Sequence, residues 1–257
     1  MRDRPLALYA RALRKLTGLG LLPTYRRYRS MIGGSHPFRQ VPMRFVGDAS
    51  ADPTEFFDHY DAFSFWAARK LEGHGRRLAI LDVGSIKMMN AILSVQHDVT
   101  ALVLRDCGDA LSNVRYVRHD VSDPLPFADA SFDVFTSMAS LQLVGLARYG
   151  DRLNPDCLPN LVAELDRVMR PSAMLLVSMC LGKNTLNFNN SWFFDLETLT
   201  RIFRGWTLVE HLVDNYSSPK GSFASAPARF VRDSSVADTR LGDYRVVFLH
   251  FARGQPA

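Results

Sequence analysis

Short apolar runs that alternate with helix-compatible stretches constrain the fold of this chain most strongly. The runs cover residues 78–83, 99–104, 114–117, 132–136 and 174–179. Runs of this length, rich in aliphatic and β-branched residues, predict buried strands, and the stretches between them can form helices. Strands that alternate with helices predict a parallel sheet with helices on both faces.

Segments on either side of these runs extend the pattern. Residues 56–71 crowd aromatic side chains into a predicted helix with a large buried face, and 161–169 show helical spacing. Arg170-Pro171-Ser172 is predicted to close the second helix before the next strand. Residues 206–213 and 244–251 predict two strands that form an antiparallel pair at one edge of the sheet.

The first 33 residues differ in charge from the rest of the chain. They hold eight arginines and lysines and a single acid, Asp3, in a protein of formal net charge +5. Leu6, Tyr9, Leu13 and Leu16 fall at helical spacing among the basic residues. We therefore divide the chain into a basic amphipathic extension, 1–33, and one domain, 34–257. The helix either contacts an anionic membrane or an acidic protein, or packs on its own domain with a solvated basic face.

Composition narrows the class of protein. The chain is 47% hydrophobic and 22% charged, which is typical of a globular domain with a packed core.

The sequence lacks an apolar run of about 18 residues, and arginines and lysines interrupt the stretch that would have to be the apolar part of a signal peptide. We therefore expect a cytoplasmic protein, free or peripheral to a membrane. Cys107, Cys157 and Cys180 lack CxxC spacing, so we expect neither a disulfide framework nor a metal site. We expect no nucleic-acid binding either, because no basic stripe with interleaved aromatic residues is present.

Polar residues follow three of the predicted strands. Gly84 and Ser85 follow the first, His119 and Asp120 follow the third, and residues 137–140 follow the fourth. Ligands of open parallel sheets bind at the carboxyl ends of the strands, where a glycine lets the backbone approach them closely. Taken alone, Asp82 also suits a strand-end turn, and Asp120 an Asx turn or a helix cap.

Several motifs, in consistent order and spacing, resemble class I methyltransferases that use S-adenosylmethionine. They are Ile80–Ser85, Val117–Phe127, Ser131–Val134 and Glu164–Pro171. The chain resembles more closely a methyltransferase-like family associated with polysaccharide biosynthesis, through Gly145–Asp151, Gly182-Lys183 and Phe188-Asn189.

The resemblance spans about residues 55–215 and implies a fold. This is a Rossmann-like α/β fold with a mainly parallel seven-stranded sheet, an antiparallel edge strand and helices on both faces.

The resemblance also implies roles for individual residues. The turn formed by Asp82, Gly84 and Ser85 would face the methionine part of S-adenosylmethionine. Asp120 would accept a hydrogen bond from the adenine amino group. Arg148, Tyr149 and Asn189 would orient a polar acceptor.

The chain departs from the resembling families at several of these places. Val103 stands where an acid usually binds the ribose hydroxyls, and Asp106 could replace that acid only through an unusual turn. Gln142 and Leu143 replace a Glu-His pair, and Ser191 replaces a second histidine. A hydroxyl acceptor needs a base, which leaves Asp151 as the candidate in the 145–151 loop. That loop could equally be structural, with an internal ion pair.

Two hypotheses follow. In the first, the protein is an S-adenosylmethionine-dependent methyltransferase that methylates an oxygen of a sugar, a glycan or another small polar acceptor. In the second, it keeps the fold without the activity and serves as a scaffold or partner subunit, beside an active methyltransferase, in glycan biosynthesis.

Overall fold

The computed structural model describes residues 59–84, 87–106, 111–187, 190–214, 230–232, 234–235 and 244–253, with four isolated residues near the N-terminus. The chain divides into two units, Met1–Glu55 and Phe56–Ala257. In the first unit, Pro23, Arg26, Arg27 and Ser30 are helical and exposed. The rest of the predicted extension and its boundary at residue 33 lie outside the described residues.

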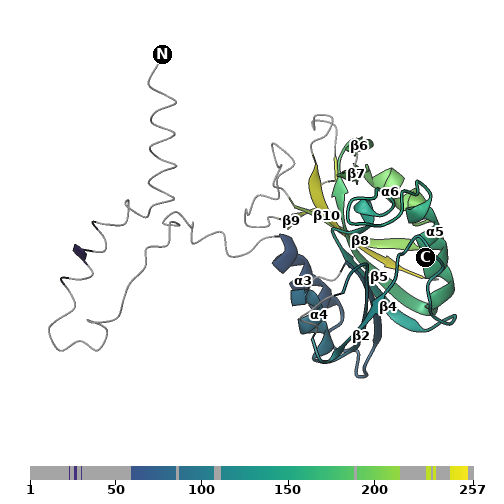
Figure 1. Ribbon diagram of the computed structural model, residues 1–257, viewed down its shortest axis with the longest axis horizontal. Coiled ribbons are helices and arrows are strands. Elements are labelled where there is room, and N and C mark those ends of the chain that lie inside the picture. The colour runs from purple at the N-terminus through teal and green to yellow at the C-terminus, as the bar shows by residue number, and fades with distance from the viewer. Residues whose placement is uncertain are drawn as a thin grey trace, which may run out of the picture. The chain divides into compact units, whose positions relative to one another are not determined.

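The described part of the second unit is built on one sheet, whose strand order is β3-β2-β1-β4-β5-β10-β8-β9 (Figure 1). Strands β1 to β5 pair in parallel, and β10 runs antiparallel to both of its neighbours, β5 and β8. The predicted, mainly parallel sheet with an antiparallel pair toward one edge is therefore confirmed, and the two-residue β9 extends it. The strands are β1 (Ala79–Val83), β2 (Asp98–Val103), β3 (Val114–Arg118), β4 (Phe132–Met138), β5 (Met169–Leu181), β8 (Thr207–Asp214), β9 (Phe230–Val231) and β10 (Arg245–Ala252).

Helices cover both faces of this sheet. Figure 1 shows α3 (His59–Lys70) and α4 (Lys87–Ser94) on one side, and α5 (Cys157–Val168) and α6 (Leu196–Ile202) on the other. Each pair of helices covers its own apolar cluster. A short hairpin of β6 (Thr185–Asn187) and β7 (Ser191–Phe193) follows β5, and the 3-10 turn η2 (Leu141–Leu143) follows β4. In the described part of the chain, no helix is long and apolar enough to cross a membrane.

The two apolar clusters follow from the strand period of two. Leu81, Phe135 and Leu175 lie side by side across β1, β4 and β5 and belong to the cluster under α5 and α6. The neighbouring residues Ile80 and Leu176 point to the opposite cluster, under α3 and α4. Since successive strand residues face opposite sides of a sheet, a strand buried on both faces must be apolar almost throughout.

The segment Arg170-Pro171-Ser172 differs from the prediction. It does not close α5 as a loop, because β5 already begins at Met169. The register between β4 and β5 shifts from Phe132↔Met169 to Val134↔Met174, so the segment forms a bulge within the strand. A bulge tolerates Pro171, which has no N–H for the ladder.

Asp133 in β4 collects hydrogen bonds at the amino-terminal end of the sheet. Its carboxylate accepts from Arg76 Nη2 at 2.7 Å, from Arg170 Nη1 at 2.6 Å and from the Ala79 backbone N–H at 2.8 Å. The residue is only 6% exposed. Burial by itself would raise the pKa of Asp133, but these hydrogen bonds and the two arginine charges outweigh it and hold the pKa far below its usual value.

We predict that Asp133→Asn lowers the free energy of unfolding at pH 7 by about 1–3 kcal/mol, because two arginines and the Ala79 N–H lose a charged acceptor that is buried. The depressed pKa means that this stabilisation is fully present above the unfolded-state pKa of about 4, declines below it and is lost only as the pH falls through the lower folded-state pKa. Chemical denaturation between pH 7 and pH 3 should therefore show a constant difference between the two proteins above about pH 5 that narrows toward pH 3.

Asp98→Asn is the matched control, because Asp98 pairs with Arg77 at 2.9 Å on the exposed surface. Asp98→Asn should lower the free energy of unfolding by less than about 1 kcal/mol. Equal losses of free energy of unfolding in the two variants would contradict the structural role of Asp133.

Candidate functional site

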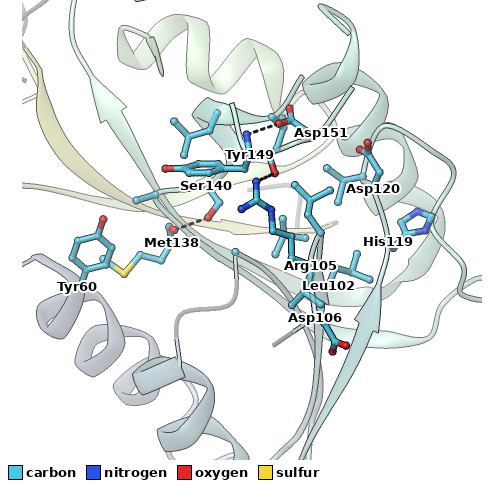
Figure 2. Close-up of a pocket in the computed structure, with 18 residues that line it drawn as sticks. Tyr60, Leu102, Arg105, Asp106, His119, Asp120, Met138, Ser140, Tyr149 and Asp151 are labelled. Carbon is cyan, nitrogen blue, oxygen red and sulfur yellow. Dashed lines mark hydrogen bonds between the residues drawn. The ribbon is translucent and has the colours of Figure 1, made fainter. Parts of the chain in front are cut away.

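The main cavity lies at the carboxyl ends of the parallel strands. It has a volume of about 410 Å³ and is drawn in Figure 2. Because β1 to β4 run in parallel, the residues that follow them meet at this one edge of the sheet. The cavity is lined by Tyr60, Val83, Gly84, Leu102, Val103, Leu104, Arg105, Asp106, His119, Asp120, Val121, Met138, Ala139, Ser140, Leu143, Val144, Tyr149 and Asp151.

Gly84 forms the turn after β1. Its φ of +130° is unfavourable for residues with a side chain, and a Cβ there would lie 2.1 Å from Ser140 Oγ. The Ser140 hydroxyl is fixed by donating to the Met138 carbonyl at 2.9 Å. Glycine is therefore required for the close approach of the turn after β1 and the turn after β4. Ser85, the next predicted residue, lies outside the described residues.

Asp82 does not line the cavity. It is fully buried, and its carboxylate accepts from Thr136 Oγ1 at 2.9 Å and from Asn90 Nδ2 at 3.3 Å. These contacts join β1 to β4 and to α4. Asp82 therefore holds the end of β1, next to the Gly84 turn, against β4 and α4.

Asp120 lines the cavity after β3. Its Oδ1 accepts from the Ser122 backbone N–H at 2.9 Å, and its Oδ2 from the Arg152 backbone N–H at 3.1 Å. Burial by itself would raise the pKa of Asp120, but these hydrogen bonds and the Arg152 charge outweigh it and keep the pKa below its usual value. The carboxylate is thus ionised and held in place in the wall of the cavity.

The residues at and after the end of β2 bring Arg105, a cation, to the cavity. Val103, Arg105 and Asp106 all line the cavity. Arg105 Nη2 donates to the Tyr149 carbonyl at 2.7 Å, and Figure 2 shows the guanidinium directed at that loop. The Asp106 carboxylate points away from Arg105 in the same view. The guanidinium therefore brings a positive charge close to the end of β2, two residues after Val103, the position at which the resembling families carry a ribose-binding acid.

The loop 145–151 is organised around Asp151. The two carboxylate oxygens accept from the backbone N–H groups of Ala147 and Tyr149, each at 3.1 Å. Ala147 has a φ of +59°, an uncommon conformation for a residue with a side chain. Arg148 donates to the carbonyl and the side-chain oxygen of Asn190, and no Arg148–Asp151 ion pair occurs among the described residues. The loop is internally hydrogen-bonded, but by backbone groups and without the ion pair considered from the sequence.

A smaller cavity, of about 70 Å³, lies beside the first and shares four lining residues with it. Gln142, Leu143 and Ser191 all line it, so the positions of the two replaced histidines converge here. The substrate residue Asn189 predicted from the sequence lies outside the described residues. The lining is Tyr60, Ala139, Gln142, Leu143, Arg148, Tyr149, Cys180, Asn190, Ser191, Phe193 and Tyr244.

Some lining residues were not singled out as site residues from the sequence, among them Tyr60, Cys180 and Arg105. Tyr60 comes from α3 and Cys180 from the carboxyl end of β5, and both fall within patterns typical of core residues. Arg105 had a detectable signal, because it follows the predicted end of a strand at the ligand-binding edge.

A family model matches residues 75–225, more than half of the chain. Its description is "Caenorhabditis protein of unknown function, DUF268". The chain belongs to this family. A comparison of this DUF268 protein with the sequences of curated proteins gives no match.

Solved structures share the fold of this DUF268 protein at low identity. A Burkholderia thailandensis 1,6-didemethyltoxoflavin-N1-methyltransferase, solved with S-adenosylhomocysteine, is 19% identical with a TM-score of 0.51, over 76% of this chain and 79% of the other. A putative sarcosine dimethylglycine methyltransferase from Galdieria sulphuraria is 13% identical with a TM-score of 0.52, over 75% and 86%. The N-methyltransferase NodS from Bradyrhizobium japonicum is 12% identical with a TM-score of 0.50, over 80% and 94%. The fold is therefore that of the methyltransferases.

We predict that Gly84→Ala lowers the free energy of unfolding by more than about 2 kcal/mol, because backbone strain adds to the contact with Ser140. Gly73→Ala is the control, since Gly73 also has a positive φ, of +84°, but nothing lies within 4 Å of a Cβ there. Chemical denaturation of both variants tests this. Equal losses of free energy of unfolding in the two variants would show that Ser140 moves away from the new methyl group without destabilising the fold.

Proposed function

We propose that this DUF268 protein is an S-adenosylmethionine-dependent methyltransferase that acts on a hydroxyl of a sugar, a glycan or another small polar acceptor. The observation that carries the proposal is the cavity at the carboxyl ends of β1 to β4, with the Gly84 turn and the ionised Asp120 in its wall. The fold neighbours from B. thailandensis and B. japonicum were both solved with S-adenosylhomocysteine, which supports this choice of cofactor.

The dimensions of the cavity suit a nucleoside ligand. A volume of about 410 Å³ lies within the usual range for small-molecule sites. Gly84 lines the cavity, and with Ser85 it would contact the methionine part. Asp120 would accept a hydrogen bond from the adenine amino group, and Asp106 is the carboxylate nearest in sequence to the strand end that normally binds ribose.

In the proposed reaction, S-adenosylmethionine held by the Gly84 turn and Asp120 would supply a methyl group on a positively charged sulfur. The acceptor hydroxyl would be the nucleophile, and Asp151 would take its proton. Arg148, Tyr149 and Asn189 orient the acceptor. Most of the rate gain comes from holding the two reactants in line.

One observation favours the alternative of a non-catalytic scaffold or partner subunit. Arg105 reaches across from the end of β2 to the 145–151 loop, and Val103 offers no hydrogen-bond acceptor to a ribose. A protein of this kind would keep the fold and bind an active methyltransferase of glycan biosynthesis. Absence of cofactor binding is the outcome that would favour it.

For the basic extension 1–33 we propose contact with an anionic membrane surface or an acidic protein. The exposed Arg26 and Arg27 support this. The protein would then act in the cytoplasm, at or near a membrane.

Cofactor binding is tested by calorimetric titration of the full chain with S-adenosylhomocysteine. We expect Asp120→Ala to weaken binding by about 1–3 kcal/mol, because the adenine amino group loses its acceptor. Val103→Asp should strengthen binding, since it supplies an acceptor for the ribose. Val103→Thr controls for the change of shape, and an unchanged affinity of a folded Val103→Asp protein would contradict the assignment of Val103 to the ribose site.

Catalysis is tested with Asp151→Asn, assayed as conversion of S-adenosylmethionine with a panel of nucleotide sugars and oligosaccharides. We expect turnover to fall about 100-fold to 10,000-fold with cofactor affinity nearly unchanged, because a general base contributes that much. Asp156→Asn is the control, since this exposed aspartate does not line the cavity. If Asp151→Asn instead lowers the melting temperature, the affinity and the turnover together, its role is structural.

A further inference from the structure

The smaller cavity is the space into which an acceptor bound beside the cofactor would extend. Tyr60, Ala139, Leu143 and Tyr149 line both cavities, so the two are contiguous. Its volume of about 70 Å³ suffices for a few heavy atoms but not for a sugar ring. One substituent of a larger molecule is therefore what this cavity can take.

Gln142 in η2 supplies an unused hydrogen-bond acceptor at this cavity. The residue is only 1% exposed, and its Nε2 donates to Cys180 Sγ at 3.6 Å. Its Oε1 has no hydrogen-bond partner among the described residues. A buried carbonyl oxygen without a donor destabilises a protein, so a ligand that brings an N–H or O–H is favoured here.

Arg148 disfavours a cation in this cavity, and Gln142 Oε1 disfavours an anion. Burial raises the pKa of the Cys180 thiol to about 12, so it is neutral at pH 7. Arg148 is the cation of this lining, and its charge disfavours an ammonium group. A carboxylate has no hydrogen to offer Gln142 Oε1 and would place its own lone pairs against that oxygen.

We propose that the small cavity binds an uncharged hydroxyl or amide N–H group of the methyl acceptor, and that Gln142 selects it by accepting its hydrogen. The inference rests on the proposed function for the identity of the ligand as a methyl acceptor. The preference of the cavity for a neutral donor rests on the described residues alone. Gln142 is thus a specificity-determining residue that binds and orients the acceptor without removing its proton.

Three probes of nearly equal shape test this preference: acetamide, acetate and acetamidinium. Acetamide is a neutral N–H donor, acetate is an anion without a donor, and acetamidinium is a cation. Each is titrated into the full chain at pH 7 and constant ionic strength, and the methyl NMR signals of Ala139 and Leu143, which line the cavity, are followed. We expect acetamide to bind at least about tenfold more tightly than either ion. Equal binding of the three, or no saturable shift with acetamide, would overturn the proposal.

Gln142→Leu removes the acceptor and should reduce acetamide affinity about tenfold, to the level of the ions. Gln142→Met, which is closer in shape, serves if the leucine variant does not fold. Gln96→Leu, at an exposed position after α4, is the matched control and should leave acetamide binding unchanged. A folded Gln142 variant that keeps the preference for acetamide would refute the role of this residue.

Titration of the same proteins with S-adenosylhomocysteine separates the two proposals. Loss of acetamide selectivity in a Gln142 variant that still binds S-adenosylhomocysteine supports the inference independently of turnover. Acetamide selectivity without S-adenosylhomocysteine binding would leave the cavity's preference standing and overturn the methyltransferase proposal. S-adenosylhomocysteine binding without acetamide selectivity would overturn only the inference.

Discussion

The buried carboxylate of Asp82 is the interaction on which the geometry of the site depends. A carboxylate is costly in a protein interior unless hydrogen bonds satisfy it, and here Thr136 of β4 and Asn90 of α4 do so. The Ser137 hydroxyl also donates to the Val83 carbonyl at 2.7 Å, one residue further along both strands. Together these contacts fix the carboxyl ends of β1 and β4 against each other. The close approach of Gly84 and Ser140 follows from that arrangement.

The two cavities beside this junction differ in charge. The larger one is bordered by Asp120, Asp151 and Arg105, whose charged groups already bond to backbone atoms of the protein. Groups anchored in this way offer a ligand fixed positions and little movement, which suits chemistry that depends on positioning. The smaller cavity is lined by the neutral Cys180 thiol, by Gln142 with its unsatisfied carbonyl oxygen, and by Arg148, which already donates to Asn190. We therefore propose cofactor binding in the first cavity and acceptor recognition in the second.

The small cavity brings together the two positions at which the resembling family has histidines. Leu143 and Ser191 are far apart in the sequence, yet both border the small cavity. A histidine there could both accept a hydrogen bond and take a proton at neutral pH, whereas the Gln142 carbonyl can accept a hydrogen bond but cannot take a proton. Recognition and deprotonation of an acceptor would thus be divided, with Gln142 in one cavity and Asp151 in the other.

The sequence by itself determined the sheet, most of its strands to within a residue or two, and the Gly84 and Asp120 positions at its ligand-binding edge. It could do so because apolar runs and strand-end glycines are local signals, and a parallel sheet brings its carboxyl ends together whatever the loops do. The bulge at 170–172 was missed, because it depends on the register against β4 and on the buried Asp133. Only the tertiary structure decided that Asp82 faces the core, that Arg105 bonds to Tyr149, and that Gln142 meets Cys180. These partners are separated by tens of residues, and strand order and packing, which no local pattern encodes, bring them into contact.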